Sequence, residues 1–134
     1  MNSQNIFADM PVISAYSRAQ AIEDGVLVDV SETSEARELR FRFPIALTSA
    51  VWGMCVEVPE GVAWQDWHGR LYDILFMMKA AIRGAEPGSD LIRFGLRVRN
   101  DNSPGLPPLV RLKAQCGPGD NAEPVITVMF PDED

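Results

Sequence analysis

The stretch from about Trp64 to Arg83 constrains the fold more than any other part of the sequence. Apolar residues recur there at steps of three and four positions, which is the spacing of one face of an α-helix. They are Trp64, Trp67, Leu71, Ile74, Leu75, Met78 and Ile82. Gly84 follows as a natural helix end. We therefore expect one long amphipathic helix whose stripe from Trp64 to Ile82 faces a core.

After this helix, the period of the apolar residues changes to two, which is typical of half-buried strands. The alternating residues are Ile92, Phe94, Leu96 and Val98 in one segment and Val110, Leu112 and Ala114 in the next. Val125–Phe130 is a third, more continuously apolar segment. Loops rich in Asn, Gly and Pro separate the three at 100–108 and 117–120. This order predicts an antiparallel three-stranded meander packed against the long helix.

Two short helices are expected nearer the N-terminus. Ser17 is a suitable N-cap for the first, which Gly25 ends. Thr33 or Ser34 can cap the second, over Glu35–Arg40.

Two further segments complete the predicted fold. Val26–Val30 is rich in β-branched residues, which favours a strand, and Pro44 at a first helical turn predicts a helix that runs to about Cys55. The predicted class is α+β, with the C-terminal meander, with or without this one N-terminal strand, packed against the long helix and the shorter N-terminal helices. We expect a single domain over 1–134, with a loose arm at 1–12 and a solvated acidic tail at 131–134.

Composition, the N-terminal residues and the cysteines together predict the cellular compartment. With 46% hydrophobic and 23% charged residues, the chain has ordinary globular values. Its N-terminus carries no signal-peptide pattern, and the most apolar stretch, Ile74–Met78, is far too short to span a bilayer. Cys55 and Cys116 match no metal-ligand spacing, so we expect free thiols. A cytoplasmic protein is predicted.

Charge is distributed unevenly along the chain. The net charge is −7, yet the segment from Leu91 to Cys116 holds five basic residues against one acid, a local balance of +4. The basic residues are Arg93, Arg97, Arg99, Arg111 and Lys113. If the apolar faces of both strands turn to the core, these cations lie side by side outside, where like charges repel. They are the predicted ligand- or partner-binding residues. The alternative is that solvent and the chain's own acids, such as Glu35, Glu38 or Glu57, offset them.

Signals for catalysis are weak. His68 is the single histidine, so a site with several histidine ligands is excluded and a histidine-based triad would have to use it; a surface histidine beside the core stripe is expected. The 117–120 loop could cradle an anion, but Pro118 removes a backbone donor, which favours a tight turn. Asp29 and Glu32 could form a carboxylate pair for acid–base chemistry or metal binding. The alternative is that both are ordinary solvated side chains. We predict no catalytic residues, no metal site and no cofactor.

Several segments, in order, resemble a known family. They are Ser17–Ser31, Arg42–Pro59, Gly69–Arg83 and Leu112–Asp134. The chain resembles a family of small bacterial proteins catalogued as a domain of unknown function and often carried on plasmids, phages and integrated elements. The resemblance implies a bacterial or phage origin and an accessory role for mobile DNA, and it supplies no catalytic residues. The loop at 100–108 is longer and richer in proline than the family pattern.

Together, these observations favour a non-enzymatic protein-binding module, an accessory or host-defence inhibitor protein of a bacterial mobile element. The alternative is a binder of small anionic ligands or nucleic acid that uses the basic strand face. An enzyme is the least favoured class. The expected partner is a protein, with nucleic acid or a nucleotide less favoured and no membrane.

Overall fold

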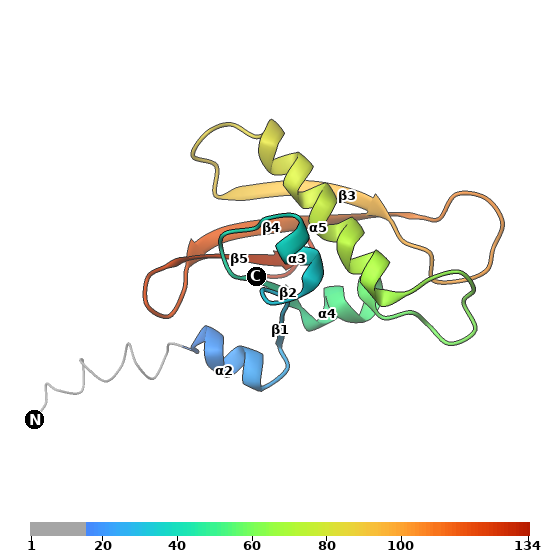
Figure 1. The fold of residues 1–134 in the computed structure, drawn as a ribbon, viewed down its shortest axis with the longest axis horizontal. Helices are drawn as coiled ribbons and strands as arrows, with labels where there is room; N and C mark the ends of the chain where they lie inside the picture. Colours follow the sequence, from blue (N-terminus) through green and yellow to red (C-terminus); the bar gives the residue numbers. More distant parts are fainter. Residues whose placement is uncertain (1–15) are drawn as a thin grey trace, which may run out of the picture.

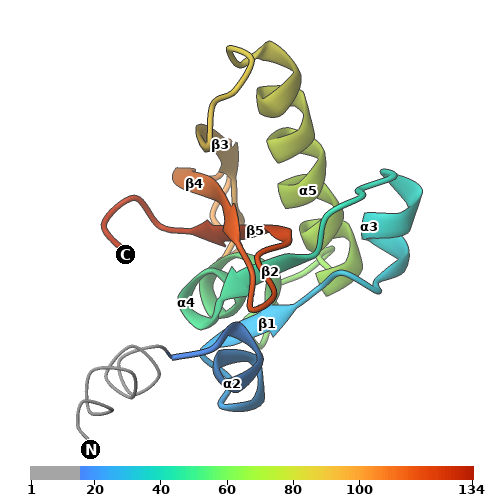
Figure 2. The same ribbon diagram turned by 90° about the vertical axis from the view of Figure 1, so that its left-hand side faces the viewer.

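The computed structural model describes residues 16–134, so the arm expected at 1–12 lies outside the described residues. Along the chain, the elements are α2 (Arg18–Glu23), β1 (Leu27–Asp29), α3 (Ser34–Glu38), β2 (Ile45–Thr48), α4 (Ser49–Val51), the π-helical segment η1 (Trp52–Val56), α5 (Trp67–Gly84), β3 (Leu91–Arg97), β4 (Leu109–Pro118) and β5 (Pro124–Met129). Helix α5 lies on one side of the sheet (Figures 1 and 2). The α+β class is confirmed.

The sheet is wider than the predicted meander. Its five strands run in the order β1-β2-β5-β4-β3. β3, β4 and β5 are antiparallel neighbours, but β5 also pairs in parallel with β2, which pairs antiparallel with β1. The prediction of three strands was therefore incomplete. The run Val125–Met129 explains the difference, because apart from Thr127 its residues are buried on both faces, as in an interior strand.

The helix predicted from Pro44 to Cys55 is wrong over its first part. Ile45, Ala46 and Leu47 are 0% exposed and form strand β2 between β1 and β5. A short apolar run cannot be assigned to strand or helix from periodicity alone. The helical part begins only after Thr48, whose hydroxyl accepts a hydrogen bond of 3.3 Å from the N–H of Val51.

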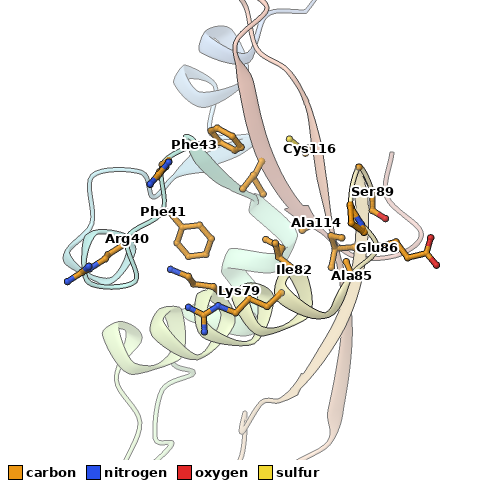
Figure 3. A pocket seen from close by; sticks show the side chains of 16 residues that line it. Arg40, Phe41, Phe43, Lys79, Ile82, Ala85, Glu86, Ser89, Ala114 and Cys116 are labelled. Carbon is orange, nitrogen blue, oxygen red and sulfur yellow. The ribbon is translucent and has the colours of Figure 1, made fainter.

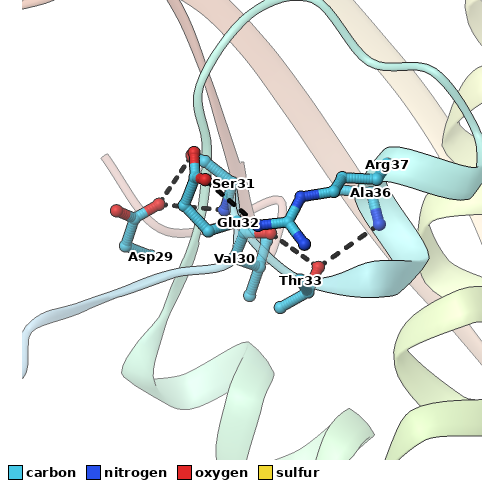
Figure 4. Close-up of polar contacts among 7 residues, drawn as sticks. All are labelled: Asp29, Val30, Ser31, Glu32, Thr33, Ala36 and Arg37. Atoms are coloured by element: carbon cyan, nitrogen blue, oxygen red, sulfur yellow. Dashed lines mark hydrogen bonds and ion pairs between the residues drawn. The ribbon is translucent and has the colours of Figure 1, made fainter.

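The N-terminal elements follow their local signals. Ser17 caps α2 by accepting a hydrogen bond of 2.9 Å from the N–H of Gln20, and β1 forms inside the predicted segment. Thr33, rather than Ser34, caps α3: its hydroxyl accepts from the N–H of Ala36 and donates to the carbonyl of Val30 (Figure 4). These caps bind groups only three positions away, which is why the sequence alone predicts the Ser17 cap and limits the other to Thr33 or Ser34.

Helix α5 begins three residues later than the predicted apolar stripe. Asp66 caps it, with a carboxylate oxygen 2.8 Å from the N–H of Gly69, so the helix begins at Trp67. The middle of the stripe is fully buried in the core: Leu71, Ile74, Leu75 and Met78. Trp64, Trp67 and Ile82 are exposed, so the core prediction is wrong at both ends. The helix crosses the sheet obliquely, and its ends lie away from the strands (Figure 1).

The C-terminal residues 131–134 are not all solvated as predicted. A carboxylate oxygen of Glu133 accepts hydrogen bonds from the Thr48 hydroxyl at 2.9 Å and from the N–H of Phe130 at 2.8 Å. Asp132 and Asp134 are exposed. The end of the chain is thus held against the end of β2.

The two thiols differ in environment and are not bonded to each other. Cys55 is buried, and burial raises the pKa of its thiol to about 11. Cys116 is only partly buried. Among residues 16–134, no helix combines the length and the apolar character needed to cross a bilayer.

Candidate binding face

The cations predicted to bind a partner lie on β3 and β4, or directly after β3. In the antiparallel register, Arg93 lies opposite Lys113, Gly95 opposite Arg111 and Arg97 opposite Leu109. The alternate positions, among them Phe94 and Leu112, are buried in the core that includes α5. The four cations within the strands therefore share the sheet face that points away from α5, as predicted. We call the set Arg93, Arg97, Arg99, Arg111 and Lys113 the basic face.

Three cations of the basic face donate hydrogen bonds to backbone carbonyls, which carry no full negative charge. Arg99 is also near a carboxylate: hydrogen bonds from Ser103 and, to a smaller extent, the charge of Arg99 lower the pKa of Asp101. Arg97 donates to Pro107 at 2.9 Å, Arg99 to Ser103 and Gly105 at 2.6 Å each, and Lys113 to Pro131 at 3.0 Å. Within residues 16–134, the guanidinium groups of Arg93 and Arg111 have no hydrogen-bond or ion-pair partner, and the ion pairs present are Arg37–Glu32 and His68–Glu35. None of the acids Glu35, Glu38 and Glu57 therefore forms an ion pair with a cation of the basic face in the described part of the chain.

An exposed apolar group adjoins the end of the same hairpin: Trp64, Leu106 and Leu109. Trp64 is 98% exposed and has a φ of +64°, a conformation that a bulky residue rarely adopts. Its loop is fastened to the β3–β4 loop by Asn102, which accepts from the N–H of Ala63 and donates to the carbonyl of Gly61. Sequence analysis placed Trp64 in the core; the signal against this was Asp66, a far better N-cap than its neighbours.

Arg70 holds this end of the molecule together from inside. It is 6% exposed, and its guanidinium donates to the carbonyls of Cys55, Met54 and Arg99 and to the side-chain oxygen of Asn100, at 2.7 to 3.1 Å. Burial lowers the pKa of Arg70. Because these bonds join α5 to η1 and to the end of β3, the loops that carry the exposed apolar group have a rigid base.

The sequence matches a known family. A family model described as "Family of unknown function (DUF6573)" matches residues 1–134. The chain belongs to DUF6573. No curated protein and no solved structure matches it. The resemblance to a domain family of unknown function is thereby confirmed, while a bacterial, plasmid or phage origin stays a prediction.

His68 of this DUF6573 chain contacts a buried carboxylate. Its Nδ1 lies 3.1 Å from an oxygen of Glu35, and its ring stacks on Trp67 with 3.6 Å between the ring centroids. The other oxygen of Glu35 is buried and has no hydrogen-bond partner in the described part of the chain. The contact joins α3 to α5.

The turn after β4 in this DUF6573 chain anchors α2. The carboxylate of Asp120 accepts hydrogen bonds from the backbone N–H of Ala19 at 3.0 Å and of Arg18 at 2.8 Å, and these bonds lower the pKa of Asp120. A carboxylate at a helix N-terminus is stabilised by the exposed N–H groups there. The predicted loop at 117–120 is wrong at its first two residues, because Gly117 and Pro118 end strand β4 and pair with Val125 and Pro124. The turn lies at 119–123, and its two charged side chains, Asp120 and Glu123, are acids.

Asp29 and Glu32 do not act as a pair. Asp29 accepts hydrogen bonds from Ser31, whereas Glu32 forms an ion pair with Arg37 at 3.2 Å (Figure 4). Each carboxylate thus has its own partner. Over residues 16–134, no group of three or more His, Cys, Asp or Glu side chains could hold a metal ion.

Proposed function

We propose that this DUF6573 chain is a non-enzymatic binding module that docks an acidic surface of a partner protein on its basic face. One observation carries the proposal: Arg93 lies directly opposite Lys113, and no carboxylate among residues 16–134 forms an ion pair with either of them. Like charges opposite one another destabilise a strand pair. An acidic partner removes this repulsion, and complementary charge also raises the rate of association.

The exposed apolar group favours a protein over a nucleic acid as the partner. Tryptophan and arginine are the residues most enriched at the energetic centres of protein interfaces. Trp64 fits this pattern, because it is almost fully exposed on a strained backbone that rests on a rigid base. Proteins that bind single-stranded nucleic acid place aromatic residues among their cations. The outward positions of β3 and β4 hold none.

A titration with two polyanions tests the proposal. A labelled peptide of glutamate and leucine, and a labelled oligothymidine of equal charge, are titrated with the protein at low salt while fluorescence anisotropy is recorded. We expect the peptide to bind more tightly. Replacing Arg93→Glu and Arg111→Glu together should abolish its binding and leave the fold unchanged, because both side chains are exposed and have no partner among the described residues.

The matched control carries the same charge change on the other side of the sheet. Arg42→Glu with Arg83→Glu lowers the net charge equally and should leave peptide binding within about twofold of wild type. Tighter binding of the oligothymidine would instead favour a nucleic-acid binder. Absence of binding to either probe at low salt, or an equal loss in both double variants, would overturn the proposal.

For the biological setting, we propose an accessory or host-defence inhibitor protein of a bacterial mobile element, acting in the cytoplasm. Its support is the sequence resemblance together with the small size of the chain. The genes beside the coding sequence test this directly. Plasmid or phage genes, next to a gene for an acidic partner, are the expected finding; metabolic operons would contradict it.

A further inference from the structure

A pocket of about 450 Å³ opens on the helix side of the sheet, opposite the basic face (Figure 3). It lies between the end of α5, the α3–β2 connection and the loop before β3. Its floor is formed by Ile92, Ala114, Cys116 and Ile126. These four lie on the core face of the sheet by register, beyond the part that α5 covers. Phe41, Phe43 and Ile82 add apolar walls.

Cations dominate the rim of this pocket: Arg40, Arg42, Lys79 and Arg83. Lys79 donates a hydrogen bond to the carbonyl of Leu39 and lies 5.5 Å above the Phe41 ring. Within residues 16–134, the guanidinium groups of the three arginines have no hydrogen-bond or ion-pair partner. The single carboxylate that lines the pocket, Glu86, lies on the far side from Arg40 and Lys79 in Figure 3. The rim therefore has an excess of positive charge.

Arg40 is held in the rim by a strained backbone. It follows α3 with a φ of +61° and closes the helix by a pair of hydrogen bonds, from its own N–H to Arg37 and from Phe41 to Ala36. This helix ending normally carries glycine at the position of Arg40, because a β-carbon is unfavourable there. Backbone strain of this kind concentrates at functional sites.

We propose that the pocket binds a small amphipathic anion: an apolar body with one carboxylate or phosphate group. The body lies on the floor of Ile92, Ala114 and Ile126, and the head group is attracted by the rim cations, among them Arg40, Arg42 and Arg83. Planar guanidinium groups match both oxyanions in geometry. A nucleotide fits less well, because the described lining holds, apart from the four rim cations, only the polar side chains of Ser89, Glu86 and Cys116, which are too few to recognise a base. The volume lies in the range of sites for drug-sized ligands.

Displacement of a fluorescent probe tests the proposal. Anilinonaphthalene sulfonate, itself an apolar body with an anionic group, is bound to the protein and displaced by decanoate, decyl phosphate, decanol or inorganic phosphate. Both decyl acids should displace it at concentrations at least about tenfold lower than decanol does, because charge-assisted hydrogen bonds hold the head group. The tighter of the two acids identifies the head group. Inorganic phosphate should not displace the probe.

The variants locate the site. Arg42→Glu with Arg83→Glu should weaken both acids about tenfold or more and leave decanol unchanged. The matched control, Arg93→Glu with Arg111→Glu, makes the same charge change on the opposite face and should bind as wild type does. Arg40→Gly removes a rim cation without disturbing the backbone, so it should also weaken the acids. This variant keeps the test valid if the double reversal fails to fold.

Cys116 supplies an independent readout, since it forms part of the floor. A thiol reagent should modify Cys116 and leave the buried Cys55 untouched, and saturating decanoate or decyl phosphate should slow that modification about tenfold or more. Equal binding of decanol and the acids, equal losses in both double variants, or unprotected Cys116 would each overturn the proposal. None of these outcomes depends on whether the basic face binds a protein.

Discussion

Arg40 occupies a backbone position that glycine fills in most helices that end this way. Its φ of +61° brings the β-carbon close to the following carbonyl oxygen. The side chain is exposed, and its guanidinium forms no hydrogen bond or ion pair with the described residues that would offset this cost. Trp64 shows the same combination of a left-handed backbone and an exposed side chain. Neither Arg40 nor Trp64 is therefore expected to stabilise the fold, although both present a large side chain to solvent.

A substitution at Arg40 should therefore stabilise the protein. Arg40→Gly relieves the left-handed conformation and is expected to raise the free energy of unfolding by about 1 kcal/mol. Denaturant unfolding followed by circular dichroism measures this change. Arg42→Gly, two residues further along and without a positive φ, is the control and should give no gain. If Arg40→Gly lowered the free energy by more than about 0.5 kcal/mol, the argument from strain would be wrong.

At the scale of elements, α5 provides most of the helical contribution to the core. Ile74 is fully buried in the main cluster, whereas Met77, three positions further along the helix, is 38% exposed. Ile74→Ala should lower the free energy of unfolding by about 2–5 kcal/mol, through lost apolar transfer and a cavity. Met77→Ala should cost less than about 1 kcal/mol. Equal effects in denaturant unfolding would show that the helix is not seated as described.

The contact between α2 and the turn after β4 should depend on pH. The pKa of Asp120 is lowered by hydrogen bonds from Ala19 and Arg18, so its folded-state value lies below its unfolded-state value. The stabilisation is then complete above the unfolded-state pKa and is lost as pH falls through the folded-state pKa. Asp120→Asn should therefore be less stable than wild type near neutral pH, and the difference should shrink in acid. A difference in unfolding free energy that is constant from neutral to acid pH would contradict this.

At the scale of the whole molecule, one sheet separates two cationic surfaces. The basic face and the exposed apolar group are fixed by the β3–β4 hairpin, whereas the pocket uses the opposite face where α5 ends (Figures 2 and 3). The surfaces differ in shape as well as position: an open strand face suits a partner protein, and a hollow with an apolar floor suits a small ligand. A charge reversal on either side is therefore the control for the other.

The sequence by itself determined the features that depend on near neighbours. The caps at Ser17 and Thr33 form with groups three residues away, so residue type and spacing predicted the first cap and narrowed the second to Thr33 or Ser34. The placement of Arg93 and Lys113 on one face was also predictable, because side chains alternate along any strand and the apolar partners of these two residues had to face the core.

Only the tertiary structure decided the features that depend on distant partners. The run Ile45–Thr48 is a strand because β1 and β5 bind its two edges, and nothing within the run distinguishes this from a buried helix. Trp64 fits the apolar stripe of the sequence, yet its side chain is exposed. Exposure depends on how the elements pack, which the spacing of residues does not show. The pocket brings Arg40, Arg83 and Cys116 together from three distant segments. Local sequence patterns do not predict such contacts, because the contacts form only when the sheet and α5 pack against each other.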